Sequence, residues 1–347
     1  MKDRCAGGAM ACVGAVIGAG FASGREVVTF FSRYGAHSWW LILLSALVMM
    51  LLCAISMREA SRLCAKSWCS IYSKSPKPVQ FGTQVCVALL MAVTGGAMVS
   101  AAGHMIALLW PSEWAYPVGA VGTLLLAWFI GFGGTRPLSV ISGVLATLFL
   151  IAVVMVLACE PGGEAAVVPL NAPPAFGTLL WAAVRASAYA AMNLTIAIGV
   201  ICKCAKRSKR GVCRLSALFG FTLIALLFLS NYLYLKHPEL ENEAFPVVRL
   251  LSGFGRPGFV ASVLLLYLAI FTTLIAIVCT LRNAVDAHVK TPTLSAIATL
   301  GLPLAVSVVG FAEIVESLYA PAGLGCFVLV FVPLMIRRRR AGRQKAS

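Results

Sequence analysis

Long apolar runs, separated by short polar clusters, make up most of the chain. A membrane-spanning helix needs about 20 consecutive and mostly apolar residues, and ten segments meet this requirement. We predict spans at residues 6–34, 38–60, 79–110, 115–132, 136–159, 175–203, 211–235, 258–284, 292–311 and 313–336. Because the polar stretches between them are short, the pattern indicates an all-α integral membrane protein with a single transmembrane domain over residues 1–347.

The composition excludes a soluble enzyme, because 60% of the residues are hydrophobic and 12% are charged, against roughly 45–50% and about 25% in soluble domains. With a cytoplasmic N-terminus, 22 of the 28 basic residues fall on the cytoplasmic side and four fall outside, as the positive-inside rule requires. We therefore expect a multi-pass protein of the cell membrane with both termini in the cytoplasm. Its basic cytoplasmic tail, residues 337–347, would contact anionic lipids rather than nucleic acid.

The first span contains a cluster of glycines that runs directly into two charges. Segment 18–24 holds three glycines and a serine, and Arg25 and Glu26 follow it. Close helix packing would explain an isolated glycine pair, but a charged pair within a span needs a cavity or a partner. We therefore predict that segment 18–24 is non-helical and lines a central cavity.

The sixth span carries a polar stripe on an otherwise apolar helix. Arg185, Tyr189 and Asn193 stand at positions i, i+4 and i+8 and so share one face. Such a stripe can be simple interhelical bonding, worth about 0.6 kcal/mol per contact. Spans one and six are also the first members of two groups of five, and interrupted spans at matching positions indicate inverted repeats. We predict repeats at about 6–159 and 175–336, with helices one and six both broken.

The outer segments are short, and the longest of them covers residues 236–257. Its apolar stretch at 246–251 is expected to form a short helix over the outer mouth of the bundle.

The first span also resembles a known family. Residues 14–26 read Gly-Ala-Val-Ile-Gly-Ala-Gly-Phe-Ala-Ser-Gly-Arg-Glu, and Phe-Phe at 30–31 and Tyr-Gly at 34–35 follow. This motif resembles the opening helix of the YkvI-type uncharacterised membrane proteins, which resemble outlying members of the amino acid–polyamine–organocation superfamily. The resemblance implies a LeuT-like fold of ten transmembrane helices in a 5+5 inverted repeat, and a secondary transporter, but it names no substrate. Arg25 stands where many relatives are expected to carry Gln.

A substrate site follows from this resemblance. The half-helix that begins near Ser23 would present N–H groups and a positive dipole to a carboxylate, and span six would form the other wall. The expected substrate-binding residues are Gly18, Ala19, Gly20, Phe21, Ala22, Ser23, Gly24, Tyr189 and Asn193.

The resemblance also implies a sodium site in span eight. One carbonyl and two hydroxyls at i, i+3 and i+4 would come from Ala269, Thr272 and Thr273, and carbonyls freed by the first break, those of Gly14 and Ile17, would complete the shell. Threonines within a span, however, often bond to the carbonyl one turn earlier on their own helix.

A gate is the third feature that the resemblance implies. Arg25 would pair with Glu316 early in span ten, with Glu313 one turn earlier on the same face. Glu26 or Arg185 would serve in either role, and a simple acidic cap on the outer surface is the competing interpretation.

These features favour a secondary active transporter of a small zwitterionic solute, an amino acid, with sodium or proton coupling. A receptor of the same fold that senses a solute without moving it is the alternative. An enzyme is disfavoured, because none of the four histidines belongs to a recognisable catalytic motif. They are His37, His104, His237 and His288. Cys202, Cys204 and Cys213 match no common zinc spacing. We expect no cofactor beyond a sodium ion, and as partners only the solute and membrane lipids, while the oligomeric state stays open.

Overall fold

The computed structural model describes residues 3–65, 68–131, 148, 176–205, 208–286, 289 and 291–343. Within these ranges every regular element is a helix. The predicted fifth span, 136–159, lies outside the described residues apart from residue 148. The other predicted spans each coincide with one helix or with an interrupted series of helices.

The first span is broken at Gly18 and at Gly24. It consists of α1 (Asp3–Val16), α2 (Ala19–Ser23) and α3 (Arg25–Phe30), and the 3-10 helix η1 (Ser32–His37) follows it. Gly18 is extended (φ −84°, ψ −173°), and Gly24 adopts the left-handed conformation (φ 85°), which glycine tolerates at little cost.

The prediction that all of segment 18–24 is non-helical is therefore wrong. Ala19–Ser23 forms the short helix α2, in which the Ala22 N–H donates to the Gly18 carbonyl (3.0 Å) and the Gly24 N–H donates to the Phe21 carbonyl (3.0 Å). The five residues between the breaks include helix-compatible alanine and phenylalanine, so the interruption is confined to the two ends of α2.

Long helices account for most of the remaining chain. Those before the undescribed stretch are α4 (Ser38–Arg62), the short α5 (Trp68–Ile71), α6 (Lys77–Leu109) and α7 (Ala115–Gly131). Those after it are α9 (Phe176–Lys203), α10 (Lys209–Lys236), η2 (Pro238–Asn242), α11 (Pro246–Ser252), α12 (Gly255–Asp286) and α13 (Pro292–Ser307). Proline occupies the first turn of α6, α11 and α13, where its missing N–H costs no hydrogen bond. Helix α11 confirms the predicted short helix, while its place on the outer side of the membrane stays a prediction.

The sixth span is one continuous helix, α9, and the prediction of a break in it is wrong. Its central part is rich in alanine, and α9 contains no proline. Two polar side chains bond within the helix: the Asn193 amide donates to the Tyr189 carbonyl (3.1 Å), and the Thr195 hydroxyl donates to the Ala191 carbonyl (2.8 Å). These two groups are thus satisfied without unwinding the backbone, while Tyr189 and Arg185 bond to groups outside α9.

The last span is interrupted by two π-helical turns. It runs through α14 (Phe311–Glu313), η3 (Ile314–Leu318), α15 (Tyr319–Cys326), η4 (Phe327–Phe331) and α16 (Val332–Arg343). Pro333 lacks an N–H for the Leu329 carbonyl, four residues earlier, and the Thr83 hydroxyl of α6 lies within hydrogen-bond distance of that carbonyl (3.0 Å) as well as of the Val79 carbonyl of its own helix (2.8 Å). The Tyr72 hydroxyl donates to the adjacent Val330 carbonyl (2.8 Å). Neighbouring elements therefore satisfy the backbone that the proline disturbs.

In the described part of the chain, six helical stretches are long and apolar enough to cross a membrane. They are Ser32–Arg62, Lys77–Leu109, Gly177–Lys203, Lys209–Lys236, Gly255–Asp286 and Phe311–Arg338. Helices α7 and α13 are shorter but apolar. These helices support a multi-pass all-α membrane protein, while the count of ten spans and the 5+5 repeat stay predictions.

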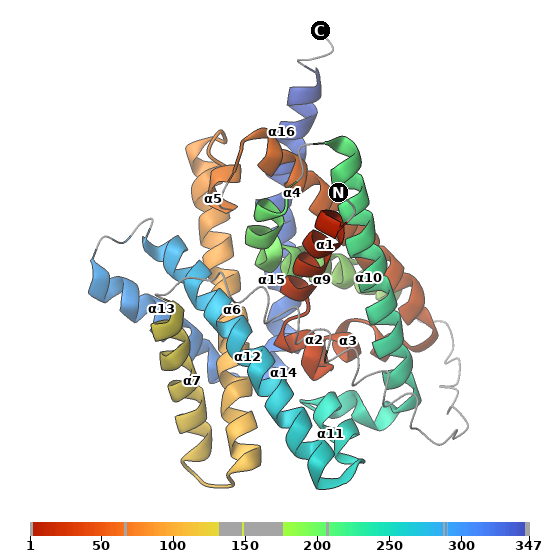
Figure 1. Cartoon of the computed structure of the whole chain (residues 1–347), viewed down its shortest axis with the longest axis vertical. Helices are drawn as coiled ribbons and strands as arrows, with labels where there is room; N and C mark the ends of the chain where they lie inside the picture. The colour runs from red at the N-terminus through yellow and green to blue at the C-terminus, as the bar shows by residue number, and fades with distance from the viewer. Residues whose placement is uncertain are drawn as a thin grey trace.

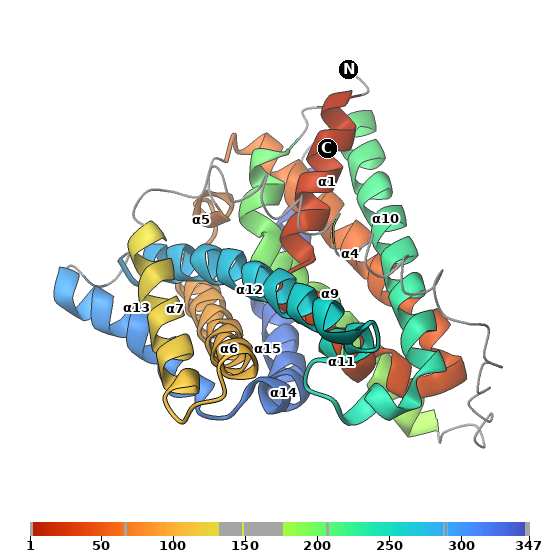
Figure 2. The same cartoon turned by 60° about the horizontal axis from the view of Figure 1, so that its bottom comes forward.

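Helix α9 lies inside the bundle, where it packs against α4, α15 and α1. Helix α12 crosses in front of α6 and contacts α2, α7 and α13 (Figures 1 and 2). The start of α1 and the helix α5 lie toward one end of the bundle, and α11 lies toward the other end (Figure 1). The two breaks of the first span are thus placed between α9, α10 and α12, in the interior.

Candidate functional site

The segment that follows the first break is completely enclosed. Every residue of α2 and α3 is buried, including the charged Arg25 and Glu26, each 5% exposed. Helix α2 packs against α11 and α12, and α3 packs against α9, α10 and η3. The Ser23 hydroxyl donates to the Gly20 carbonyl (2.7 Å) and accepts from the Arg25 N–H (3.2 Å). Ser23 therefore stabilises the turn between the two helices, and the first N–H of α3 is already bonded.

Tyr189 of α9 is the predicted substrate residue that contacts this segment most extensively. Its ring lies 5.0 Å from that of Phe30 and 5.3 Å, edge-on, from that of Phe31, measured between ring centroids. Its hydroxyl hydrogen-bonds with the Glu26 carboxylate. The structure thus brings Tyr189 to the first span, while Asn193 bonds to the backbone of its own helix.

Two glycines make room for polar side chains at this point. A Cβ at position 20 would overlap the Glu26 carboxyl group, and a Cβ at position 24 would overlap the Tyr234 hydroxyl of α10. Gly20 and Gly24 therefore permit a buried carboxylate and a buried phenol to lie directly against the backbone. Tyr234 has no recognisable signal in the sequence and was not predicted.

A network of charges covers the other side of α3. Glu316 accepts from Arg25 (Nη2 to Oε2, 3.0 Å) and from Arg33 (Nη2 to Oε1, 2.9 Å). Arg25 also donates to the backbone carbonyls of Glu241 and Glu243 in the outer segment. The predicted contact between Arg25 and Glu316 is present, and its role as a gate stays a prediction.

Other members of the predicted gate have different positions. Arg185 donates to the backbone carbonyl of Glu316 (3.4 Å), and its guanidinium carbon lies 5.5 Å from the centre of the Phe30 ring. Glu313 is exposed and stands apart from the network. Arg33 was not predicted to take part, although it is one of the few basic residues in the predicted outer segments.

The predicted sodium ligands are partly brought together. The hydroxyls of Thr272 and Thr273 both donate to the Ala269 carbonyl (3.1 and 2.7 Å). Thr273 lies against the first break, 3.5 Å from where a Cβ of Gly18 would be. The Gly18 N–H donates to the Val16 carbonyl (2.8 Å) rather than to Gly14, its partner in a continuous helix. Both threonine hydroxyls thus donate to Ala269, and neither donates to the Gly14 or Ile17 carbonyl.

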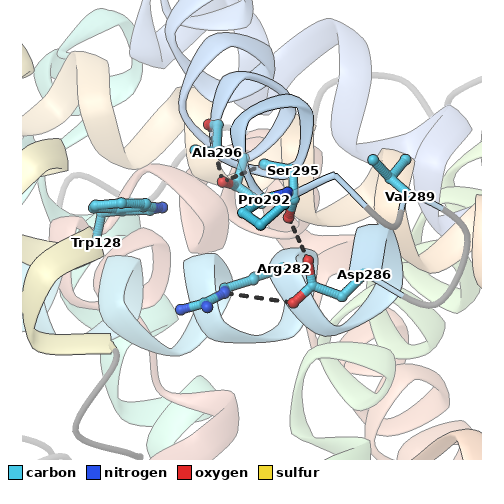
Figure 3. Close-up of a pocket in the computed structure, with 8 residues that line it drawn as sticks. Trp128, Arg282, Asp286, Val289, Pro292, Ser295 and Ala296 are labelled. Carbon is cyan, nitrogen blue, oxygen red and sulfur yellow. Dashed lines mark hydrogen bonds and ion pairs between the residues drawn. The ribbon is translucent and has the colours of Figure 1, made fainter.

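A separate cavity of about 450 Å³ lies between α7, α12 and α13. Figure 3 shows Trp128 facing the Arg282 side chain across it, with Asp286 bonded to Ser295 and to Arg282. The Arg282 Nε lies 3.4 Å from Asp286 Oδ2. None of the predicted site residues lines this cavity, and the spacing of Arg282 and Asp286, one turn apart on α12, was its only signal in the sequence.

Known proteins share both the sequence and the architecture of this chain. The chain is 24% identical over 340 residues to the uncharacterized membrane protein YkvI of Bacillus subtilis strain 168, and the match covers 96% of this chain and 95% of that protein. It superposes on a mutant of the manganese transporter of Eremococcus coleocola with a TM-score of 0.64 and 16% identity, over 95% of this chain and 78% of that one. The chain is a relative of YkvI with the LeuT-type fold.

The inward-facing conformation of Mhp1 shows the same architecture, with a TM-score of 0.64 and 12% identity over 97% of this chain and 77% of that one. The chain matches no established family profile. These solved structures agree with the fold that the resemblance implied.

Proposed function

We propose that the chain is a secondary active transporter of a small zwitterionic solute, an amino acid, that works by alternating access. The observation that carries this proposal is the doubly broken first span. Its short middle helix α2 is buried in the bundle. The helix α3 that follows contacts the aromatic and hydroxyl groups of α9, and an ion-pair network closes the outer side of α3. Broken helices at mid-membrane are the usual site of solute recognition in transporters.

The solute pocket in this proposal is formed by the predicted residues of segment 18–24 together with Tyr189. Arg25, Arg33 and Glu316 form its outer gate, because they join the first span, the outer segment and the last span. Opening toward the outside would require the separation of Glu316 from both arginines. Asn193 contributes by holding the backbone of α9 at Tyr189.

Sodium and proton coupling are both open in the proposal, and each has its own residues. A sodium ion would bind between α12 and the first break, with Thr272, Thr273 and Ala269 on one side and the Gly14 and Ile17 carbonyls on the other. Each threonine oxygen keeps lone pairs for a cation while its proton is donated to Ala269. A proton would instead require a titratable group, and Glu26 is the buried carboxyl group of the break.

The test is binding and transport by the purified full-length protein. A thermal-shift screen with the twenty standard amino acids, with and without sodium, should show stabilisation by a subset of them, because a ligand stabilises the state it binds by mass action. The same amino acids, radiolabelled, should enter proteoliposomes only when the protein is present.

Two other outcomes would redirect the proposal. Stabilisation without uptake would identify the alternative, a receptor of the same fold. Stabilisation by Mn²⁺ alone would favour the cargo named for the Eremococcus protein, although no group of three or more His, Cys, Asp or Glu side chains that could hold a metal occurs in the described ranges.

A further inference from the structure

The side chain of Glu26 is enclosed, and the described helices around it supply no counter-charge. The side chain is 5% exposed, and its Oε2 atom has no hydrogen-bond partner. The Tyr189 hydroxyl bonds to the carboxyl group, and Tyr319 of α15 is the other titratable group close to it. Among the described residues, no Lys, Arg or His forms an ion pair with Glu26.

Charged and titratable groups on the elements around α3 face elsewhere. Arg185 of α9, Arg33 of η1 and Arg25 of α3 itself are directed to Glu316 of η3. Tyr234 of α10 points at Gly24. In the described part of the chain, the carboxyl group of Glu26 lies beside the phenol groups of Tyr189 and Tyr319 and against the backbone at Gly20.

A second buried carboxylate, that of Glu59, differs from Glu26 because it is paired with arginines. Glu59 of α4 is 3% exposed, and its oxygens lie 2.9 Å from Arg337 and 3.8 Å from Arg62. An unpaired buried charge costs several kcal/mol, so Glu26 must either carry a proton or receive a cation from outside the chain.

The surroundings of Glu26 contain further unsatisfied polar atoms. The Thr29 hydroxyl, one turn along α3 and on the same face, is fully buried with no partner, and the buried Tyr234 hydroxyl also has none. Buried polar atoms without partners are rare in proteins. An ammonium group has three N–H donors and no acceptor, so it complements a carboxylate oxygen and neighbouring hydroxyl oxygens.

We propose that Glu26 binds either a proton or the ammonium group of the solute, never both, so that solute and protons are exchanged at this carboxylate. The inference rests on the proposed transport function and names the group that recognises the solute. When the ammonium arrives, the O–H bond of the Glu26 carboxylic acid breaks and the proton leaves to water, while the carboxylate pairs with the ammonium. When the solute leaves, a proton from water returns. Solute movement in one direction is thereby coupled to proton movement in the other, and a sodium ion at Thr273 remains compatible with it.

The experiment compares free amino acids with their N-acetyl derivatives, which lack the ammonium group. Thermal-shift titrations use the twenty standard amino acids and these derivatives on wild type, Glu26→Gln, Glu26→Asp and Glu59→Gln. In wild type only the free amino acids should bind, and their apparent affinity should rise about tenfold per pH unit while Glu26 is protonated, since the proton competes for the same carboxylate.

The variants separate recognition from folding. Glu26→Gln should bind free amino acids at least about tenfold more weakly, which is roughly 1.4 kcal/mol, and without pH dependence. Glu26→Asp should keep the pH dependence, and Glu59→Gln should behave as wild type. In proteoliposomes loaded with amino acids and pyranine, solute efflux through wild type should acidify the interior.

The outcomes distinguish this inference from the proposed function. Equal binding of N-acetyl derivatives, a flat pH profile in wild type, or an unchanged pH profile in Glu26→Gln would overturn the inference while leaving an amino acid transporter in place. If no amino acid bound to wild type at any pH, the proposed function would fail and the inference with it.

Discussion

Two residues of the first span have positions that exclude any side chain. Gly24 combines a left-handed backbone with contact to the Tyr234 hydroxyl, and Gly20 lies against the Glu26 carboxyl group. Both positions therefore require glycine, because a Cβ at either one would overlap a neighbouring side chain. Residue-scale substitutions can test the break and the ion site independently.

Gly24→Ala should destabilise the protein, because a left-handed alanine costs roughly 1–2 kcal/mol and its Cβ would displace the Tyr234 hydroxyl. Removing that hydroxyl with Tyr234→Phe should recover part of the loss. The measurement is the melting temperature of the purified protein. Gly82→Ala in α6 is the control, since no atom lies within 4 Å of its added Cβ, and it should be neutral or stabilising by about 0.5–1 kcal/mol. Equal effects at the two glycines would contradict this account of the break.

Thr273→Ala should weaken sodium binding by about 1–3 kcal/mol, because it removes one ligand and leaves buried carbonyls undersatisfied. Amino acid binding or uptake should then need far more sodium than in wild type. Thr280→Ala, two turns further along α12, is the control, since its hydroxyl bonds only to the Ala276 carbonyl (2.8 Å). If wild-type binding and uptake are indifferent to sodium, Thr272 and Thr273 are packing residues.

At the scale of elements, interruptions occur where another element can satisfy the backbone. The last span contains two π-helical turns, and the carbonyls near Pro333 are bonded by Thr83 and Tyr72. Helix α9 remains continuous, and its polar residues Asn193 and Thr195 bond to its own carbonyls. The polar stripe of α9 therefore does not mark a break.

Thr83→Val should destabilise the protein by about 1–3 kcal/mol, since the Leu329 carbonyl would lose the hydroxyl that contacts it from another element. Thr94→Val, also buried on α6, should cost less, because its hydroxyl bonds only to carbonyls of its own helix. Thermal unfolding of the two variants in the same detergent provides the comparison. A cost at Thr94 equal to that at Thr83 would show that the carbonyl near Pro333 needs no outside donor.

At the scale of the whole molecule, one carboxylate joins three separate parts of the chain. Glu316 of the last span holds Arg25 and Arg33, and Arg25 holds the outer segment by its carbonyls. Because the Glu316 side chain is 39% exposed, solvent weakens its ion pairs. We therefore expect the Glu316 side chain to control access to the site and to contribute little to the stability of the whole protein.

Glu316→Gln should raise deuterium uptake across residues 19–30, because the outer side of α3 would open more often. The melting temperature should change little, in line with a loss below about 1 kcal/mol. Glu313→Gln is the matched control, one turn earlier and outside the network. Unchanged exchange in Glu316→Gln would rule out a gate at this position.

The predicted orientation places Cys64 and Cys213, both exposed, on the cytoplasmic side. A membrane-impermeant maleimide should label them in inside-out vesicles but not in intact cells. Cys69 should react slowly, because burial raises the pKa of its thiol to about 11 and the thiolate is the reactive form. A cysteine introduced by Glu239→Cys in the exposed outer segment should show the opposite sidedness. Labelling of Cys213 from outside would reverse the topology.

The sequence by itself determined the class of protein, the positions of most spans and the location of the first break, because these follow from local hydropathy and from backbone preferences of glycine. It also indicated the contact between Arg25 and Glu316 through the resemblance to known transporters. Only the tertiary structure decided that α2 is helical, that α9 is unbroken and that Glu26 has no counter-charge within the described ranges. Those properties depend on which groups the other helices place beside each residue, and no local pattern encodes a partner that is distant in the sequence.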